Sequence, residues 1–234
     1  MKGGLSPVFL NAARSSDTGA ANDDAVPGLG GDHQVGPNAV IQIRAALIDA
    51  EGAGCARRVF MDAGLEDWFD TVPDRMVPAA RVHRLNSELL ASLDGETFEA
   101  VMREAGRRTG HYILENRIPG PAKRLLKLLP AGLAARALLK AIKANSWTFA
   151  GKAGVRVTPG HPAIIEIGAN PLPMPGCPWH AAVFETLFAT LLRRPVFVSH
   201  RIAADRTRLD RFELRWRSQT SVDSVEASRF MSPR

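Results

Sequence analysis

Hydrophobic residues recur at helical spacing through the first part of the chain, from Pro37 to Asn145. The clearest case is 95–118, where apolar positions three and four residues apart form one stripe along an amphipathic helix. Asn38 is placed to cap an earlier helix that Gly52 and Gly54 would stop. Prolines interrupt a helical pattern over 65–93 and separate two apolar-basic helical segments, 124–130 and 131–145.

The period then changes to that of strands. Short β-branched and aromatic runs bounded by Gly, Pro and Asn predict strands at 146–151, 154–160 and 162–170. A helix follows from Cys177 to about Arg194, and two alternating segments, 195–203 and 210–216, then predict a hairpin. This order indicates an α+β fold, with N-terminal helices packed on one face of a four- to five-stranded, mainly antiparallel sheet.

Composition sets the domain organisation that we expect. With 234 residues, 45% of them hydrophobic, the chain can bury one large core. Residues 1–36 are rich in Gly, Asp, Ser and Ala and predict a flexible leader, 37–217 a single ligand-binding domain, and 218–234 a flexible tail. The two cysteines, the lack of an apolar run long enough to span a membrane and the lack of a secretory signal favour a cytoplasmic protein.

Positive charge is concentrated in one block. Seven basic residues and no acidic residue lie between positions 117 and 143: Arg117, Lys123, Arg124, Lys127, Arg136, Lys140 and Lys143. Such a block could meet nucleic acid, a membrane surface or a small anionic ligand, or it could be a solvated helix face.

The segment CPWHAAVFETLF (177–188) carries the most reactive residue types. A thiol at a helix N-terminus has its thiolate favoured by the helix dipole, and His180 could share the face of Cys177. The pair is either half of a zinc site, completed from His161, Glu166 and His200, or a nucleophile with its base, or a buried apolar cysteine beside a capping histidine.

Aromatic residues gather near the strand-rich half. Trp147, Phe149 and Trp179, with Tyr112 on the long helix, are typical of a core, but they would also suit a planar apolar ligand whose carboxylate arms meet Arg or Lys. His83 and His111 lie on predicted helices. GLGG (28–31) lacks the preceding strand and following helix of a dinucleotide fingerprint.

Three blocks together resemble a known family: ENRIPGPAKRLLKLLPAGLAARALLKAIKANSWTFAG (115–151), CPWHAAVFETLF, and the strand pair that closes on DRFELRW. Over residues 38–217 the chain resembles the BchJ-type bacteriochlorophyll biosynthesis proteins of the 4-vinyl-reductase domain family. The resemblance implies a fold shared with small subunits of a vesicle-tethering complex, a homodimer formed through its helices, and a pocket between helices and sheet for a magnesium tetrapyrrole. The family name also implies reduction of a vinyl group. Sensor members carry a cysteine-rich metal site, whose first cysteine Cys177 matches, whereas Ile202 and Asp210 stand where further cysteines are expected.

The residues themselves favour binding over reduction. A vinyl reductase needs a hydride or electron source, and the sequence offers no nucleotide fingerprint and too few cysteines for an iron–sulfur cluster. We therefore expect a carrier of a Mg-tetrapyrrole with no built-in cofactor or metal ion, a possible partner of other bacteriochlorophyll biosynthesis enzymes, and no binding of nucleic acid. The alternatives are an 8-vinyl reductase of divinyl protochlorophyllide with an external electron donor, and a small-molecule sensor or scaffold.

In the carrier hypothesis the candidate residues have separate roles. Trp147, Phe149 and Trp179 would line the pocket, and His180 or His111 would be an axial ligand of magnesium. The remaining candidates are Cys177 and Tyr112 beside the ligand, and Arg117, Lys123 and Arg124 as partners of its carboxylates.

Overall fold

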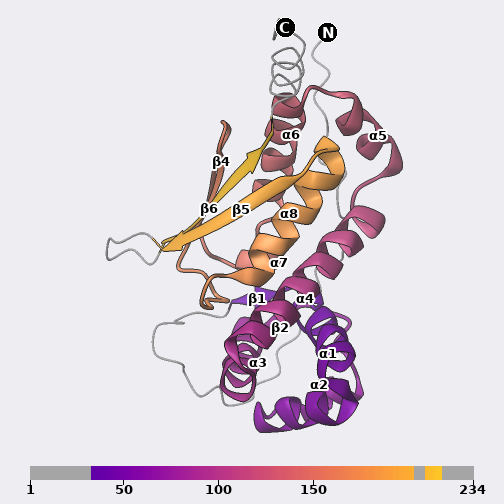
Figure 1. Cartoon of the computed structure of the whole chain (residues 1–234), viewed down its shortest axis with the longest axis vertical. Helices are drawn as coiled ribbons and strands as arrows, with labels where there is room; N and C mark the ends of the chain where they lie inside the picture. Colours follow the sequence, from indigo (N-terminus) through magenta and orange to yellow (C-terminus); the bar gives the residue numbers. More distant parts are fainter. Residues whose placement is uncertain (1–32, 203–208, 218–234) are drawn as a thin grey trace, which may run out of the picture.

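The computed structural model describes residues 33–202 and 209–217, and it joins a helical layer to an antiparallel sheet (Figure 1). The helices are α1 (Asn38–Asp62), α2 (Glu66–Asp70), α3 (Ala79–Ser92), α4 (Gly95–Asn116), α5 (Gly120–Leu128), α6 (Ala131–Ala144), α7 (Trp147–Ala150) and α8 (Pro178–Leu192). The strands are β1 (Gln34–Val35), β2 (Val77–Pro78), β3 (Val155–Thr158), β4 (Ala163–Gly168), β5 (Val196–Ile202) and β6 (Leu209–Trp216). The α+β prediction is confirmed.

The main sheet has four strands in the order β3-β4-β6-β5, and all its pairs are antiparallel. Buried and part-exposed residues alternate along β6, which shows which face of the sheet is buried. Asp210, Phe212, Leu214 and Trp216 are buried and alternate with residues that face outward. The outward face carries an ion-paired row, in which Glu166 pairs with Arg156 and Arg211.

Helix α8 lies between α4 and the sheet (Figure 1). Its first turn is buried on every side, whereas Glu185, Thr186, Ala189 and Thr190 form one part-exposed face further along the helix. Two glycines let α4 approach it closely. A Cβ on Gly106 would lie 2.3 Å from the carbonyl oxygen of Trp179, and one on Gly110 would lie 2.7 Å from Cβ of Thr186.

The N-terminal helices form a second group at the lower end of the view in Figure 1. Gly52 breaks the first helix as predicted, because its backbone leaves helical geometry with φ 82°. A second helical segment of α1 then continues to Asp62. Residues 33–36 were assigned to the leader but belong to the fold, because β1 pairs with β2 and Val35 is completely buried. The rest of the leader, the tip of the predicted hairpin and the predicted tail lie outside the described residues.

The predicted strand at 146–151 is wrong, since residues 147–150 form α7. Its backbone bonds are local, as in the bond from the Ala150 amide to the Ser146 carbonyl, and Gly151 then turns the chain with φ 54°. Helix α7 and the residues after it are tied to the start of the described chain. The Gly36 amide donates to the Thr148 carbonyl at 2.7 Å, and the Lys152 amide donates to His33 Nδ1 at 3.1 Å.

None of the helices in the described ranges is both long enough and apolar enough to cross a bilayer.

The close approach of α4 and α8 predicts the effect of one methyl group. We expect Gly106→Ala to destabilise the fold by about 1–3 kcal/mol, because the added Cβ collides with backbone that cannot move without shifting α8. Thermal and urea unfolding measure this loss. Gly132→Ala on α6 is the matched control, since a Cβ there meets nothing within 4 Å and alanine is the better helix former by about 1 kcal/mol. Equal stability of the two variants would contradict the prediction.

Candidate functional site

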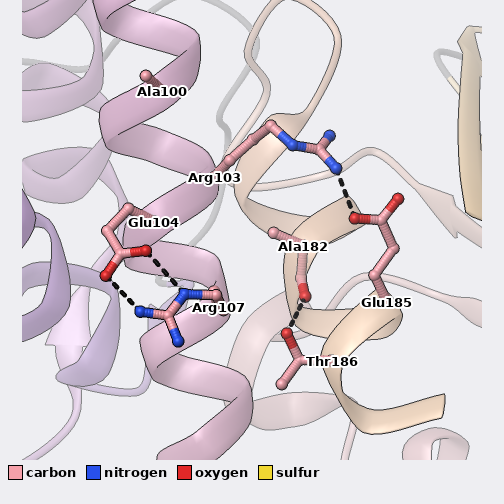
Figure 2. A pocket seen from close by; sticks show the side chains of 7 residues that line it. All are labelled: Ala100, Arg103, Glu104, Arg107, Ala182, Glu185 and Thr186. Carbon is pink, nitrogen blue, oxygen red and sulfur yellow. Dashed lines mark hydrogen bonds and ion pairs between the residues drawn. The ribbon is translucent and has the colours of Figure 1, made fainter. Parts of the chain in front are cut away.

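A shallow groove of about 280 Å³ runs between α4 and α8 (Figure 2). Its charged side chains are already paired with one another, since Arg103 bonds Glu185 and Arg107 bonds Glu104. The hydrogen bond from Arg107 lowers the pKa of Glu104 to about 2, so this carboxylate stays ionised. The groove therefore offers little unpaired chemistry to a ligand.

A second group of polar side chains is buried beside the N-terminus of α8. Asp210 is its centre: Oδ1 lies 2.6 Å from His200 Nε2, and Oδ2 accepts from Asn170 Nδ2 at 2.9 Å. The thiol of Cys177 lies 3.9 Å from Oδ1 and 3.8 Å from the Asn170 amide nitrogen. Burial by itself raises the pKa of Asp210, but the hydrogen bonds from His200 and Asn170 outweigh it, and the pKa lies below its usual value.

The predicted start of the helix is confirmed, and of the alternatives for Cys177 its burial favours the buried apolar cysteine over the nucleophile. Cys177 adopts a left-handed conformation, with φ 45°, and Pro178 follows as the first helical residue. Burial, followed by the negative charge of Asp210, raises the pKa of the Cys177 thiol to about 12. These effects outweigh the helix dipole, so Cys177 is a neutral thiol that donates toward Asp210 rather than an activated nucleophile.

The same group contains a set of possible metal donors. One ligand atom each from Cys177, His200 and Asp210 lies within 4.8 Å of the others. Thiol, imidazole and carboxylate are donors that zinc accepts, so these residues could hold such an ion. Of the further ligands weighed from the sequence, His161 instead contacts the Trp216 backbone at 2.6 Å, and Glu166 faces away on the outer side of the sheet. The expectation that the chain holds no metal stays a prediction.

His180 lies deeper on α8, in an aromatic enclosure. Its ring centroid is 4.9 Å from that of Trp179, 5.8 Å from that of Phe212 and 6.2 Å from that of Phe149. The side chain is 1% exposed, and within the described part of the chain neither ring nitrogen has a hydrogen-bond partner. Burial lowers the pKa of His180 to about 4, which keeps the imidazole neutral.

The predicted site residues separate into two groups. Cys177, Trp179 and His180 are buried at the start of α8, with Phe149 partly buried above His180. The others lie nearer the surface: Trp147 is 44% exposed on α7, His111, Tyr112 and Arg117 are at the end of α4 or just after it, and Lys123 and Arg124 are on α5. Lys123 already donates to the Leu114 carbonyl at 2.7 Å, whereas Arg117 stacks over Tyr112.

Sequence reasoning missed Asn170, Phe184 and Phe212 as members of the site. A signal for the polar part was present in the strands. Asp210 and His200 fall at inward positions of alternating segments, where a polar side chain must find a buried partner. No comparable signal marks Asn170, which lies in the irregular segment after β4.

The sequence is similar to two curated proteins. It is 43% identical over 166 residues to the bacteriochlorophyll synthase 23 kDa chain of Cereibacter sphaeroides, a match that covers 68% of this chain and 79% of the relative. It is 39% identical to the protein of the same name from Rhodobacter capsulatus, covering 68% of this chain and 76% of the relative. The chain belongs to the BchJ-type bacteriochlorophyll biosynthesis proteins.

The fold of this chain is similar to that of solved H-NOX proteins. The unliganded Fe(II) H-NOX protein from K. algicida matches 79% of this chain and 98% of its own with TM-score 0.55 at 9% identity. A mutant H-NOX of T. Tengcongensis matches 76% of this chain and 96% of its own, with TM-score 0.52 at 12% identity. A third structure, from work on the function of heme distortion in the H-NOX family, matches 78% of this chain and 94% of its own, with TM-score 0.50 at 14% identity.

No protein-family model matches the chain. Its place in the 4-vinyl-reductase domain family and the likeness to vesicle-tethering subunits therefore stay predictions.

The two thiols should differ sharply in reactivity. We expect Cys55, which is partly exposed on α1, to react with an aromatic disulfide reagent in the native BchJ-type protein, and Cys177 to react only after unfolding, because it is buried and un-ionised. Counting released thiolate with and without denaturant measures this. Cys55→Ser is the control, and fast labelling of that native variant would contradict the assignment.

The buried, unpartnered His180 predicts an acid sensitivity. Its folded pKa of about 4 lies below the ordinary value of 6.5, so as pH falls from 6.5 toward 4 the unfolded chain binds a proton that the folded chain does not. This costs the fold up to about 3 kcal/mol over that range. We expect His180→Leu to lose less stability between about pH 7.5 and about pH 4.5, measured by urea unfolding. Parallel losses in the two proteins would contradict this origin.

Proposed function

We propose that this protein acts in bacteriochlorophyll biosynthesis as a carrier that binds a magnesium tetrapyrrole intermediate and delivers it to the enzyme that uses it. The role in bacteriochlorophyll biosynthesis follows the two relatives that carry that pigment in their names. The finer proposal, that the protein binds the intermediate, depends mainly on His180.

His180 supports the proposal because it is buried without a hydrogen bond inside the described fold. Leaving a buried polar group unsatisfied costs about 1–3 kcal/mol, so a fold with no use for the imidazole would gain by replacing it. The lowered pKa keeps a lone pair free at neutral pH. A neutral imidazole nitrogen is a suitable axial ligand for a metal at the centre of a macrocycle.

The walls around His180 suit a planar apolar ligand. Trp179, Phe184 and Phe212 form rigid aromatic surfaces on the α8 and sheet side, and Phe149 of α7 covers the imidazole. His180 is 1% exposed, so a macrocycle would have to displace a neighbouring side chain, and Phe149 of α7 is the candidate. Helix α7 has four residues, the fewest of the described helices, and its displacement would break the bond between Gly36 and Thr148.

Basic side chains are available for the acidic edge of such a ligand. Arg117 and Arg124 are exposed and could meet propionate groups as charge-assisted partners. Lys123 would first have to give up its bond to the Leu114 carbonyl. Gly106 lies against Trp179 and Gly110 against Thr186, so α4 carries Arg117 toward the end of α8 away from His180. Carboxylate contacts to Arg117 and Arg124 therefore require the ligand to extend along α8.

The fold comparison is compatible with this assignment. One of the similar H-NOX structures is described by the distortion of its heme, and heme is itself a tetrapyrrole. The carrier remains preferred over the vinyl reductase, since the buried groups here are an un-ionised thiol and a paired carboxylate, neither of which supplies a hydride or an electron.

Spectral titration tests the proposal. We expect purified protein to bind Mg-protoporphyrin with a shift of its main absorption band and with quenching of tryptophan fluorescence, and to release it without chemical change. His180→Ala should weaken binding of the magnesium form by at least about tenfold while changing binding of metal-free protoporphyrin less, because an axial bond exists only in the first. Conversion of a divinyl substrate to a monovinyl product with added reductant would favour the reductase instead.

His111→Ala is the matched control, since this histidine is exposed on α4. Its spectrum with Mg-protoporphyrin should equal that of the unmodified protein. Circular dichroism confirms that each variant is folded. Equal losses for both porphyrin forms in His180→Ala would make His180 structural, and no binding by the unmodified protein would overturn the carrier.

A further inference from the structure

Helix α5 and the start of α6 present an unusual surface, which we call the α5–α6 surface: Leu125, Leu128 and Leu133, with Arg124, Lys127 and Arg136 beside them. The three leucines are 53%, 80% and 52% exposed. Scattered exposed leucines are ordinary, but these three are close together in the chain and lie among exposed cations. In the described fold α5 contains no buried residue at all.

The arrangement of α5 separates an inner from an outer side. Leu126 and Leu129 are partly buried against the core and hold the helix in place. Leu125 and Leu128 are three positions apart and therefore point the same way, outward. Arg124 and Lys127 precede them at the same spacing, so each outward leucine has a cation next to it. This is the pattern of a helix that lies in an interface between water and lipid.

The position of α5 suits contact with a flat partner. It lies at the margin of the molecule, beyond the ends of α4 and α8 (Figure 1). Pro119 and Pro130 are the residues before α5 and α6, and both have extended backbones that set these helices off from their neighbours. The surface is therefore already presented, with no need for another element to move.

We propose that the α5–α6 surface docks the protein onto anionic lipid bilayers. Charge complementarity selects this occupant, because the seven cations between positions 117 and 143 have no acidic residue among them. The exposed leucines distinguish lipid from nucleic acid, since a phosphate backbone offers them no apolar contact. They also distinguish it from a protein partner, since the surface lacks the aromatic anchors that dominate protein interfaces.

The proposal is independent of the tetrapyrrole. None of the three leucines and none of the cations Lys127 and Arg136 contributes to the binding site proposed above; Arg124 alone is shared, as a partner of a ligand carboxylate. The leucine variants below therefore let docking and ligand binding fail separately. If both hold, a hydrophobic cargo would be exchanged at a membrane surface rather than in bulk water.

Vesicle flotation with the full chain and no tetrapyrrole tests the docking. We expect the protein to float with vesicles of phosphatidylcholine and phosphatidylglycerol, and to stay behind with phosphatidylcholine alone. Leu125→Ser with Leu128→Ser should lower the bound fraction by at least about tenfold, because insertion of the apolar side is lost. Lys127→Gln with Arg136→Gln should weaken binding most at low salt, since it removes the screened attraction.

Met61→Ser with Leu90→Ser is the matched control, because these residues are 48% and 42% exposed on α1 and α3. This variant should float like the unmodified protein. Thermal unfolding verifies that all variants are folded. The proposal is overturned if the unmodified protein does not float with anionic vesicles or if the α5 leucine variant floats as well as the unmodified protein. It is also overturned if the two leucine- or methionine-to-serine variants lose the same share of their vesicle-bound fraction. Capture of a protein partner by the same leucines without vesicle binding would also overturn it.

Discussion

The structure depends on how closely α4 approaches α8. Gly106 and Gly110 bring the backbone of α4 so near to α8 that no methyl group fits between them, and the sheet closes the opposite side. Polar groups in the first turn of α8 are therefore sealed from water, where an unpaired group is costly. Further along the helix, the Thr186 hydroxyl donates a hydrogen bond to the Ala182 carbonyl one turn earlier. The tight contact thus buries the polar side chains at the start of α8, so their hydrogen bonds can be compared directly.

Two inward-facing histidines illustrate those conditions. His200 is matched by Asp210, which is in turn held by Asn170, so its burial is offset by a short charge-assisted bond. His180 has aromatic faces around it and, in the described residues, no bond to either nitrogen. The first arrangement satisfies a buried polar group, whereas the second leaves one unsatisfied, as at Asn86 and at Nε1 of Trp179 in the same described residues.

The sequence was most informative where the pattern was local. The helix at 95–118, the hairpin strands and the helix that begins with Pro178 all follow from spacing and caps. The segment 146–151 misled because its β-branched and aromatic residues have strand propensity, yet local bonds form a helical turn there. The meeting of Asn170, Cys177 and Asp210 could not be derived, because it depends on the register of β6 against β4 and on how α8 sits over both. The complete burial of the first turn of α8 likewise depends on α4, which lies far away in the sequence.

The bonds between residues 33–36 and the region of α7 give the start of the domain a second significance. The short helix that places Phe149 over His180 is bonded to this segment through Thr148 and through Lys152, just beyond its end. The segment is itself anchored by the burial of Val35. Residues 33–36 thus hold α7 in place through bonds on both sides of β1. Displacing α7 would break these bonds as well as the contact between Phe149 and His180.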